Sequence, residues 1–151
     1  MKVLLVDDEP FILQGLSVLI DWAAEGCEIV KMASNGKEAL LYLEDHEADL
    51  VITDIKMPVM SGLELLEQIR GRQISDAFFI ILSGYNDFSY AQKAIRYACM
   101  DYLVKPVQKE ALLELIRKAK SSLAVTEQNA ENERRMQEMQ LKQYIIALLR
   151  G

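Results

Sequence analysis

Residues 50–58 read LVITDIKMP, an apolar run that leads into an acidic residue, Asp54, and then into a short loop. The run Leu50–Thr53 is almost entirely apolar, as expected of a strand that is covered on both faces of a parallel sheet. In such a sheet the carboxyl ends of the strands share one edge, and ligands bind outside that edge. The pattern therefore places Asp54 where a binding site is expected.

Three further segments have the same arrangement. The nearly apolar runs Lys2–Val6, Phe78–Leu82 and Tyr102–Val104 are predicted strands, and each leads directly into polar residues. These are Asp7 and Asp8 after the first run, Ser83 after the second, and Lys105 followed by Pro106 after the third. Because the strand ends share one edge, we expect three carboxylates, a hydroxyl group and an ammonium group to converge there.

The three carboxylates predict a metal site. Two like charges about 4 Å apart repel by roughly 4 kcal/mol in a surface-like dielectric, so such a cluster persists when a hard cation sits in it. Mg²⁺ prefers oxygen ligands, uses few of them from the protein and keeps several waters. We therefore expect Asp7, Asp8 and Asp54 to hold Mg²⁺, with the backbone carbonyl of Lys56 as a further ligand.

The same groups suit the transfer of a phosphoryl group. A carboxylate accepts such a group as an acyl phosphate when a metal and a cation neutralise the oxygens, which makes Asp54 the predicted nucleophile. Lys105 would place its compact positive charge on the phosphoryl oxygens, and Ser83 would donate a hydrogen bond to them. A cis bond before Pro106 would aim the lysine, since X–Pro bonds are where cis peptides commonly occur.

Helical patterns separate the strands. Pro10, Asn35 and Ser61 favour helix starts, and apolar residues follow each of them with helical spacing. The other predicted elements are an edge strand at Ile29–Ala33 and helices around Asp87–Tyr97 and at Gln108–Ser121. Five successive strand–helix units predict an α/β fold with a parallel sheet and right-handed crossovers.

Composition narrows the function classes. The 151 residues carry a net charge of −6. This negative charge argues against electrostatic binding to nucleic acid or to an anionic membrane. No apolar stretch is long enough to span a bilayer, and Met1 leads into a strand without a signal-peptide pattern. Cys27 and Cys99 lack metal-type spacing and fit a reducing cytosol, while the single histidine, His46, disfavours zinc sites and Ser-His triads. A cytoplasmic location without membrane contact is expected.

The composition changes after residue 122. The stretch Thr126–Arg135 is polar and contains neither Pro nor Gly, so it is predicted to be a solvated helix or a frayed linker. Apolar residues return from Met136 to Leu149 and would pack against a second copy or a further domain. We therefore expect one domain at residues 1–122. Residues 123–151 would form a helical linker or extension that leads toward an absent output domain.

Taken together, the motifs Asp7-Asp8, Asp54 with its loop, Gly62, Ser83 and Lys105-Pro106 resemble the receiver domain of two-component response regulators. The resemblance covers roughly residues 1–122. It implies a flavodoxin-like, doubly wound sheet of five strands in the order 2-1-3-4-5. It also implies that a phosphohistidine on a sensor histidine kinase transfers its phosphoryl group to Asp54 in the presence of Mg²⁺.

The resemblance implies a conformational switch. In the family a Ser or Thr moves toward the phosphoryl group and an aromatic residue turns inward, and Ser83 and Tyr102 match these positions. Pro58, Gly62 and Pro106 are assigned conformational roles. The face formed by the fourth helix, fifth strand and fifth helix then changes shape and often mediates dimerisation; the C-terminal helix is the other candidate for a homodimer. Tyr102 is equally compatible with plain packing at the edge of the sheet.

Finer features resemble the receivers attached to AraC-type helix-turn-helix transcription regulators, namely Thr53–Pro58 and Leu82–Phe88. No stretch of this chain has the length or basic character of the DNA-binding module, so DNA binding is expected only of a full-length protein; a natural single-domain regulator is the alternative. Two residues depart from the pattern of the family: Ala98 stands where the family commonly has Gly, and Gly84 stands where it often has Ala. Tyr85 is expected to shield the phosphoryl group from water.

Two other functions compete with this interpretation. A haloacid-dehalogenase-like phosphatase also uses an aspartyl nucleophile, Mg²⁺ and a lysine, but places its nucleophile after the first strand in an Asp-x-Asp pattern. Here that strand ends in Asp7-Asp8-Glu9, and no cap domain is evident. A partner-binding module that works without phosphorylation is the second alternative. Rossmann and P-loop sites are excluded because the glycine-rich loop is missing, and we expect a phosphoacceptor, not a turnover enzyme.

Overall fold

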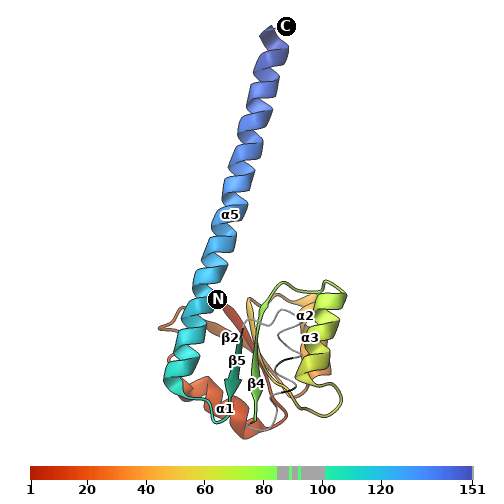
Figure 1. The fold of residues 1–151 in the computed structure, drawn as a ribbon, viewed down its shortest axis with the longest axis vertical. Coiled ribbons are helices and arrows are strands. Elements are labelled where there is room, and N and C mark those ends of the chain that lie inside the picture. The colour runs from red at the N-terminus through yellow and green to blue at the C-terminus, as the bar shows by residue number, and fades with distance from the viewer. Residues whose placement is uncertain (85–88, 90–91, 93–100, 151) are drawn as a thin grey trace. The chain divides into compact units, whose positions relative to one another are not determined.

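The computed structural model describes residues 1–84, 89, 92 and 101–150 (Figure 1). Apart from residues 89 and 92, the predicted helix around Asp87–Tyr97 lies outside the described part. The features expected of Tyr85 and Ala98 also lie outside it.

Five parallel strands form one sheet in the order β2-β1-β3-β4-β5. The strands are β1 Lys2–Val6, β2 Glu28–Ala33, β3 Leu50–Asp54, β4 Phe78–Ser83 and β5 Asp101–Val104. The parallel sheet and its order confirm the prediction, and β2 lies at an edge as expected. In the register, Asp54 stands opposite Leu82, and Ser83 opposite Val104, so the polar strand ends are level with one another.

Side chains of each strand alternate between two core layers. Leu4 and Val6 belong to the layer that packs against helices α2 (Gly36–Asp45) and α3 (Gly62–Gly71). Val3 and Leu5 belong to the opposite layer, which packs against α1 (Pro10–Leu19) and the first turns of α5. Figure 1 shows these helices on the two faces of the sheet. Burial on both faces explains why the strands read as continuous apolar runs.

Helices α2 and α3 begin where the sequence predicts. The side chain of Asn35 accepts a hydrogen bond from the amide of Glu38 at 2.9 Å, which caps α2. Ser61 accepts a hydrogen bond from the amide of Glu64 at 3.1 Å, and its hydroxyl donates to the Glu64 carboxylate at 3.2 Å. This reciprocal cap starts α3 a few residues after β3 ends, and it fixes the loop that follows Asp54.

Helix α5 includes both the predicted fifth helix and the predicted C-terminal helical extension. It runs without interruption from Lys109 to Arg150, 42 residues, whereas the sequence pattern ended the fifth helix at Ser121. The polar stretch Thr126–Arg135 is therefore helical, which its Glu, Gln, Ala and Arg residues favour. By its internal contacts the chain divides into a compact unit, residues 1–119, and a second unit, residues 120–151. In the second unit every side chain from Glu131 to Gln143 is exposed.

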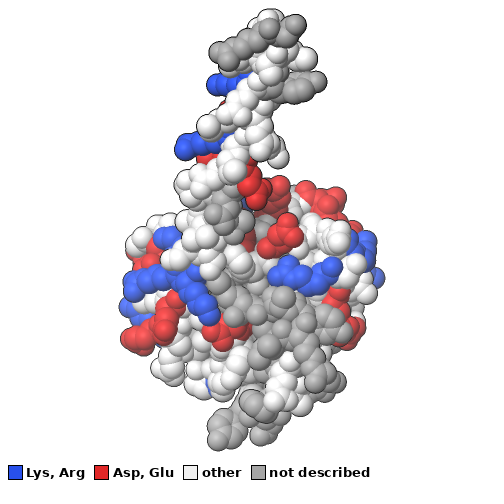
Figure 2. All heavy atoms as spheres, turned by 45° about the horizontal axis from the view of Figure 1, so that its top comes forward, with Lys and Arg blue, Asp and Glu red and all other residues white. Residues whose placement is uncertain are grey.

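Charges of both signs share the surface. On the face shown in Figure 2, the Lys and Arg side chains of the described residues lie among Asp and Glu side chains. Among the described residues, no helix is both long enough and apolar enough to cross a membrane.

Candidate functional site

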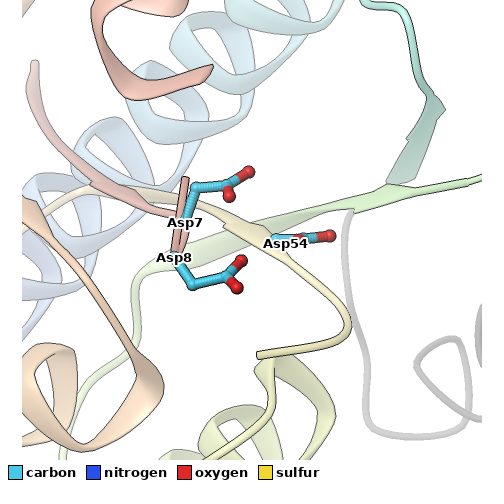
Figure 3. A group of neighbouring side chains, drawn as sticks. All are labelled: Asp7, Asp8 and Asp54. Atoms are coloured by element: carbon cyan, nitrogen blue, oxygen red, sulfur yellow. The ribbon is translucent and has the colours of Figure 1, made fainter. Parts of the chain in front are cut away.

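Three carboxylates converge at the carboxyl edge of the sheet. Asp7 and Asp8 follow β1 and Asp54 ends β3, and one carboxylate oxygen from each lies within 4.8 Å of the others. Figure 3 shows the three side chains directed toward the same region. Asp7 is fully buried and Asp54 is 8% exposed, whereas Asp8 is exposed. The cluster therefore has a buried floor and one side open to solvent.

Lys105 joins two of these carboxylates. Its Nζ lies 3.0 Å from Oδ2 of Asp7 and 3.2 Å from Oδ2 of Asp54. The backbone places it there: the amide of Lys105 donates to the carbonyl of Ser83 at 2.8 Å, and the bond to Pro106 is cis, as predicted. Residues from the ends of β1, β3, β4 and β5 thus meet in one site.

The electrostatics of the site favour a bound cation. Burial and, after it, the charge of Asp7 raise the pKa of the Asp54 carboxyl, and the opposing effect of Lys105 does not cancel the shift. Burial lowers the pKa of Lys105, but its hydrogen bond to Asp7 and the charges of both carboxylates outweigh this, so its pKa is raised. The lysine therefore stays charged, while the negative charge of Asp54 is only partly compensated. This set of oxygen donors fits Mg²⁺.

The two oxygens of the Asp54 carboxylate have different surroundings. Oδ1 accepts a hydrogen bond from the amide of Ile55 at 2.9 Å, whereas Oδ2 faces Lys105. The backbone carbonyl of Asp54 accepts a hydrogen bond from the hydroxyl of Thr53 at 3.0 Å. The sequence interpretation did not single out Thr53. The available signal was a hydroxyl residue between Val51 and Ile55, at an inward position where the strand is otherwise apolar.

Gly62 lies directly against the backbone of the acceptor. A Cβ at this residue would stand 2.1 Å from the carbonyl oxygen of Asp54 and 3.1 Å from the Thr53 hydroxyl oxygen. The Gly62 amide donates to the carbonyl of Ile55 at 3.0 Å. The role predicted for Gly62 thus has a steric basis, because only glycine permits this close approach without displacing its neighbours.

The loop between β3 and α3 is anchored by α2 as well. The amide of Gly36 donates to the carbonyl of Met60 at 3.0 Å, and a Cβ at Gly36 would stand 2.6 Å from that oxygen. Within the loop, the amide of Met60 also donates to the carbonyl of Pro58 at 2.8 Å, across Val59, whose φ is 70°. Lys56 and Pro58 are exposed in this loop. Sequence reasoning identified neither Gly36 nor Val59.

Ser83 and Tyr102 lie on the adjacent strands. Ser83 is 3% exposed at the end of β4. Tyr102, in β5, is partly buried and packs against the core layer that faces α2 and α3. The packing role is therefore observed, and the switch role stays a prediction.

Residues 3–117 match the family model described as the response regulator receiver domain. The chain belongs to the response regulator receiver family. The match covers Asp7, Asp8, the loop after Asp54 and the Lys105-Pro106 segment. All of the predicted site residues of this receiver domain lie within it.

Relatives of this receiver domain are transcriptional regulators. It is 39% identical over 112 residues to the uncharacterized transcriptional regulatory protein YesN of Bacillus subtilis strain 168, covering 74% of this chain and 30% of YesN. It is 42% identical over 115 residues to the transcriptional regulatory protein HptR of Staphylococcus aureus strain N315, covering 76% of this chain and 44% of HptR. The chain thus spans less than half the length of these relatives.

Solved structures show the same fold. The receiver domain of the response regulator AraT from Geobacillus stearothermophilus superposes with a TM-score of 0.77 at 39% identity, covering 83% of this chain and 97% of that one. A two-component transcriptional regulator AraC from Clostridium phytofermentans gives a TM-score of 0.74 at 28% identity, covering 82% and 95%. The receiver domain therefore resembles those of AraC-type regulators, as the sequence motifs indicated.

Proposed function

We propose that this receiver domain is a phosphorylation-dependent switch in which Asp54 accepts a phosphoryl group from a phosphohistidine on a sensor histidine kinase. The observation that carries the proposal is the position of Asp54, within the carboxylate cluster and 3.2 Å from the ammonium group of Lys105. A carboxylate becomes a phosphoryl acceptor where positive charge balances the transferred oxygens. Lys105 lies next to Asp54, and the carboxylate oxygens of Asp7, Asp8 and Asp54 could together bind a cation.

Asp7, Asp8 and Asp54 would hold Mg²⁺, with the Lys56 carbonyl as a further ligand. When bound, the cation supplies positive charge to the oxygens of the phosphoryl group. In the transfer, a carboxylate oxygen of Asp54 forms a bond to phosphorus as the donor's P–N bond breaks, and the electron pair of that bond stays on the imidazole nitrogen. The ammonium group of Lys105 would balance the negative charge of the phosphoryl oxygens, and the Ser83 hydroxyl would donate a hydrogen bond to one of these oxygens.

Phosphorylation would shift the balance between two packings. It adds about −1.5 to −2 charges at the acceptor, beside a lysine that Asp7 and Asp54 share. Ser83 would move toward the phosphoryl group, and Tyr102, which is partly buried, would turn inward. The change needs only a few kcal/mol of differential stabilisation. The response would appear on the face that includes β5 and α5, where a homodimer is one outcome; residues 123–151 are the other candidate surface.

The phosphohistidine donor would contact an apolar groove next to the acceptor. The groove has a volume of about 230 Å³ and lies between α1 and the segment that follows β5. Its lining residues are Phe11, Ile12, Gly15, Leu16, Leu19, Lys105, Pro106 and Val107. Lys105 both lines the groove and contacts Asp54, so a partner seated there is adjacent to the acceptor. Phe11 is 85% exposed on this helix, as a contact residue would be.

The phosphoacceptor belongs to the protein itself, so one phosphoryl group per chain is expected, without turnover of a substrate. The names of the relatives indicate a transcriptional output, and we assign DNA binding to a full-length protein. This assignment agrees with the acidic charge of the present chain.

The test is intact-mass spectrometry after incubation with acetyl phosphate and Mg²⁺, comparing the wild-type chain with Asp54→Asn. We expect one phosphoryl adduct on the wild type and none on the variant. An equal adduct on both would place the acceptor elsewhere. Absence of an adduct on both, with Mg²⁺ binding shown separately, would favour a module that works without phosphorylation.

A further inference from the structure

We propose that Thr53 is a positioning residue for Asp54 and acts through the peptide group that joins Asp54 to Ile55. The proposal rests on Asp54 as the phosphoryl acceptor. Thr53 is fully buried, and its hydroxyl donates a hydrogen bond to the backbone carbonyl of Asp54 at 3.0 Å. Thr53 thus contacts the buried backbone of the acceptor, whereas the carboxylate of the acceptor faces the side of the site that is open to solvent.

The hydroxyl is not needed for packing. Val51 and Ile55, two residues to either side of Thr53 along the chain, belong to the core layer facing α2 and α3, and strand alternation places Thr53 on that side too. A valine has nearly the same shape as a threonine and would suit such surroundings. Burying a hydroxyl is unfavourable unless it is hydrogen-bonded. The hydrogen bond to Asp54 is therefore the feature that distinguishes threonine from valine here.

One peptide group links the hydroxyl to the acceptor carboxylate. The carbonyl of Asp54 and the amide of Ile55 lie in the same planar unit. The amide of Ile55 donates to Oδ1 of the Asp54 carboxylate at 2.9 Å and to the carbonyl of Leu82 at 3.0 Å. Thr53 thus binds the carbonyl of this peptide group, and the amide of the same peptide group binds Oδ1 of the Asp54 carboxylate. Hydrogen bonds in such a chain polarise and strengthen one another.

Gly62 leaves room for this arrangement. A Cβ at Gly62 would stand 3.1 Å from the Thr53 hydroxyl oxygen and 2.1 Å from the Asp54 carbonyl oxygen, so a side chain there would disturb both partners of the hydrogen bond. The amide of Gly62 donates to the carbonyl of Ile55, which fixes the next peptide along the chain. Thr53 and Gly62 together restrict the orientation of the acceptor.

The test compares the full chain with Thr53→Val, which removes the hydroxyl, and Thr53→Ser, which keeps it. Phosphorylation by acetyl phosphate is followed by intact mass at saturating Mg²⁺, and urea unfolding is measured alongside. The loss of one hydrogen bond predicts a rate constant about three- to tenfold lower in Thr53→Val. We expect Thr53→Ser to stay within about twofold of the wild type. We expect the urea midpoints of the variants not to fall in proportion to their phosphorylation rate constants.

A second readout needs no phosphoryl group. The NMR shift of the Ile55 amide proton reports its hydrogen bond to Oδ1, and we expect it to move in Thr53→Val but not in Thr53→Ser. A wild-type rate in Thr53→Val, or a loss of rate that parallels a loss of stability, would overturn the proposal. A wild-type chain without an adduct refutes phosphorylation of Asp54, whereas an unchanged Ile55 amide refutes positioning by Thr53, so the two failures are distinguishable.

Discussion

Replacing Gly62 with alanine is the most direct test of the geometry behind Asp54. The added Cβ would stand 2.1 Å from the Asp54 carbonyl oxygen, whereas ordinary contacts begin at 3.4 Å. The start of α3 or the end of β3 must therefore move by about 1.3 Å, the difference between these two distances. Neither side yields easily, because the Asp54 carbonyl belongs to a strand paired with β4 and the Ser61 cap holds α3.

We expect Gly62→Ala to lower the free energy of unfolding by about 2–3 kcal/mol, the range for overpacking at a well-packed site. Alanine is the better helix former, which offsets less than about 1 kcal/mol of this loss. The displacement also moves the acceptor, so phosphorylation by acetyl phosphate should slow as well. Urea unfolding followed by circular dichroism measures the first effect, and intact-mass time courses measure the second.

Gly71→Ala is the matched control, because Gly71 ends the same helix and a Cβ there would have nothing within 4 Å. This variant should gain about 0.5–1 kcal/mol from helix propensity alone and keep its phosphorylation rate. If Gly62→Ala were as stable as the wild type, the close approach between α3 and the Asp54 carbonyl would be wrong.

Three further changes test other parts of the site. Asp54→Asn should be more stable than the wild type at pH 7 without Mg²⁺, because the raised pKa of Asp54 means that folding disfavours its charge. In urea titrations this advantage should shrink as the pH falls through the raised pKa of Asp54 and disappear below the ordinary aspartate value of 3.8; an advantage independent of pH would contradict the assignment. Val59→Gly should stabilise the fold by up to about 1 kcal/mol, since Val59 has a φ of 70° and is 75% exposed; a clear loss of stability would show that the loop is not strained there. Phe11→Ala should slow transfer from a phosphorylated sensor kinase about tenfold while leaving the rate with acetyl phosphate unchanged; equal slowing with both donors would exclude the groove as the contact site.

The fold follows from local signals in the sequence. A strand such as Val3–Val6 needs only four adjacent apolar residues to be recognised, and the cap at Ser61 needs only the glutamate three residues later. The edge position of β2 was indicated by the charges at Glu28 and Lys31, and the sheet order came from the family resemblance. Signals of this kind lie within a few residues of the structure that they specify, which is why they can be read from one chain.

Several details of the site were not predictable in the same way. The fit of Gly62 against Asp54 depends on the path of a loop, and the acceptor of the Thr53 hydroxyl depends on where that loop leaves room. The positive φ of Val59 opposes the preference of a β-branched residue, so propensity indicates the wrong conformation. The polar stretch of α5 has no apolar stripe, so only residue propensity and the lack of Pro and Gly favoured a helix there.

The structure also separates three carboxylates that the sequence leaves chemically alike. Asp7 is fully buried, and both of its oxygens are engaged: Oδ1 accepts from the amide of Glu9 at 2.9 Å, and Oδ2 pairs with Lys105 at 3.0 Å. Asp8 is exposed, where the water molecules of a bound Mg²⁺ would be able to exchange with solvent. Asp54 combines a small exposed fraction, through which a donor can reach it, with Lys105 at 3.2 Å and an ionised form that burial disfavours. Access, a neighbouring cation and a charge that Lys105 only partly compensates coincide at Asp54. This coincidence supports Asp54 as the acceptor and its two neighbours as metal ligands.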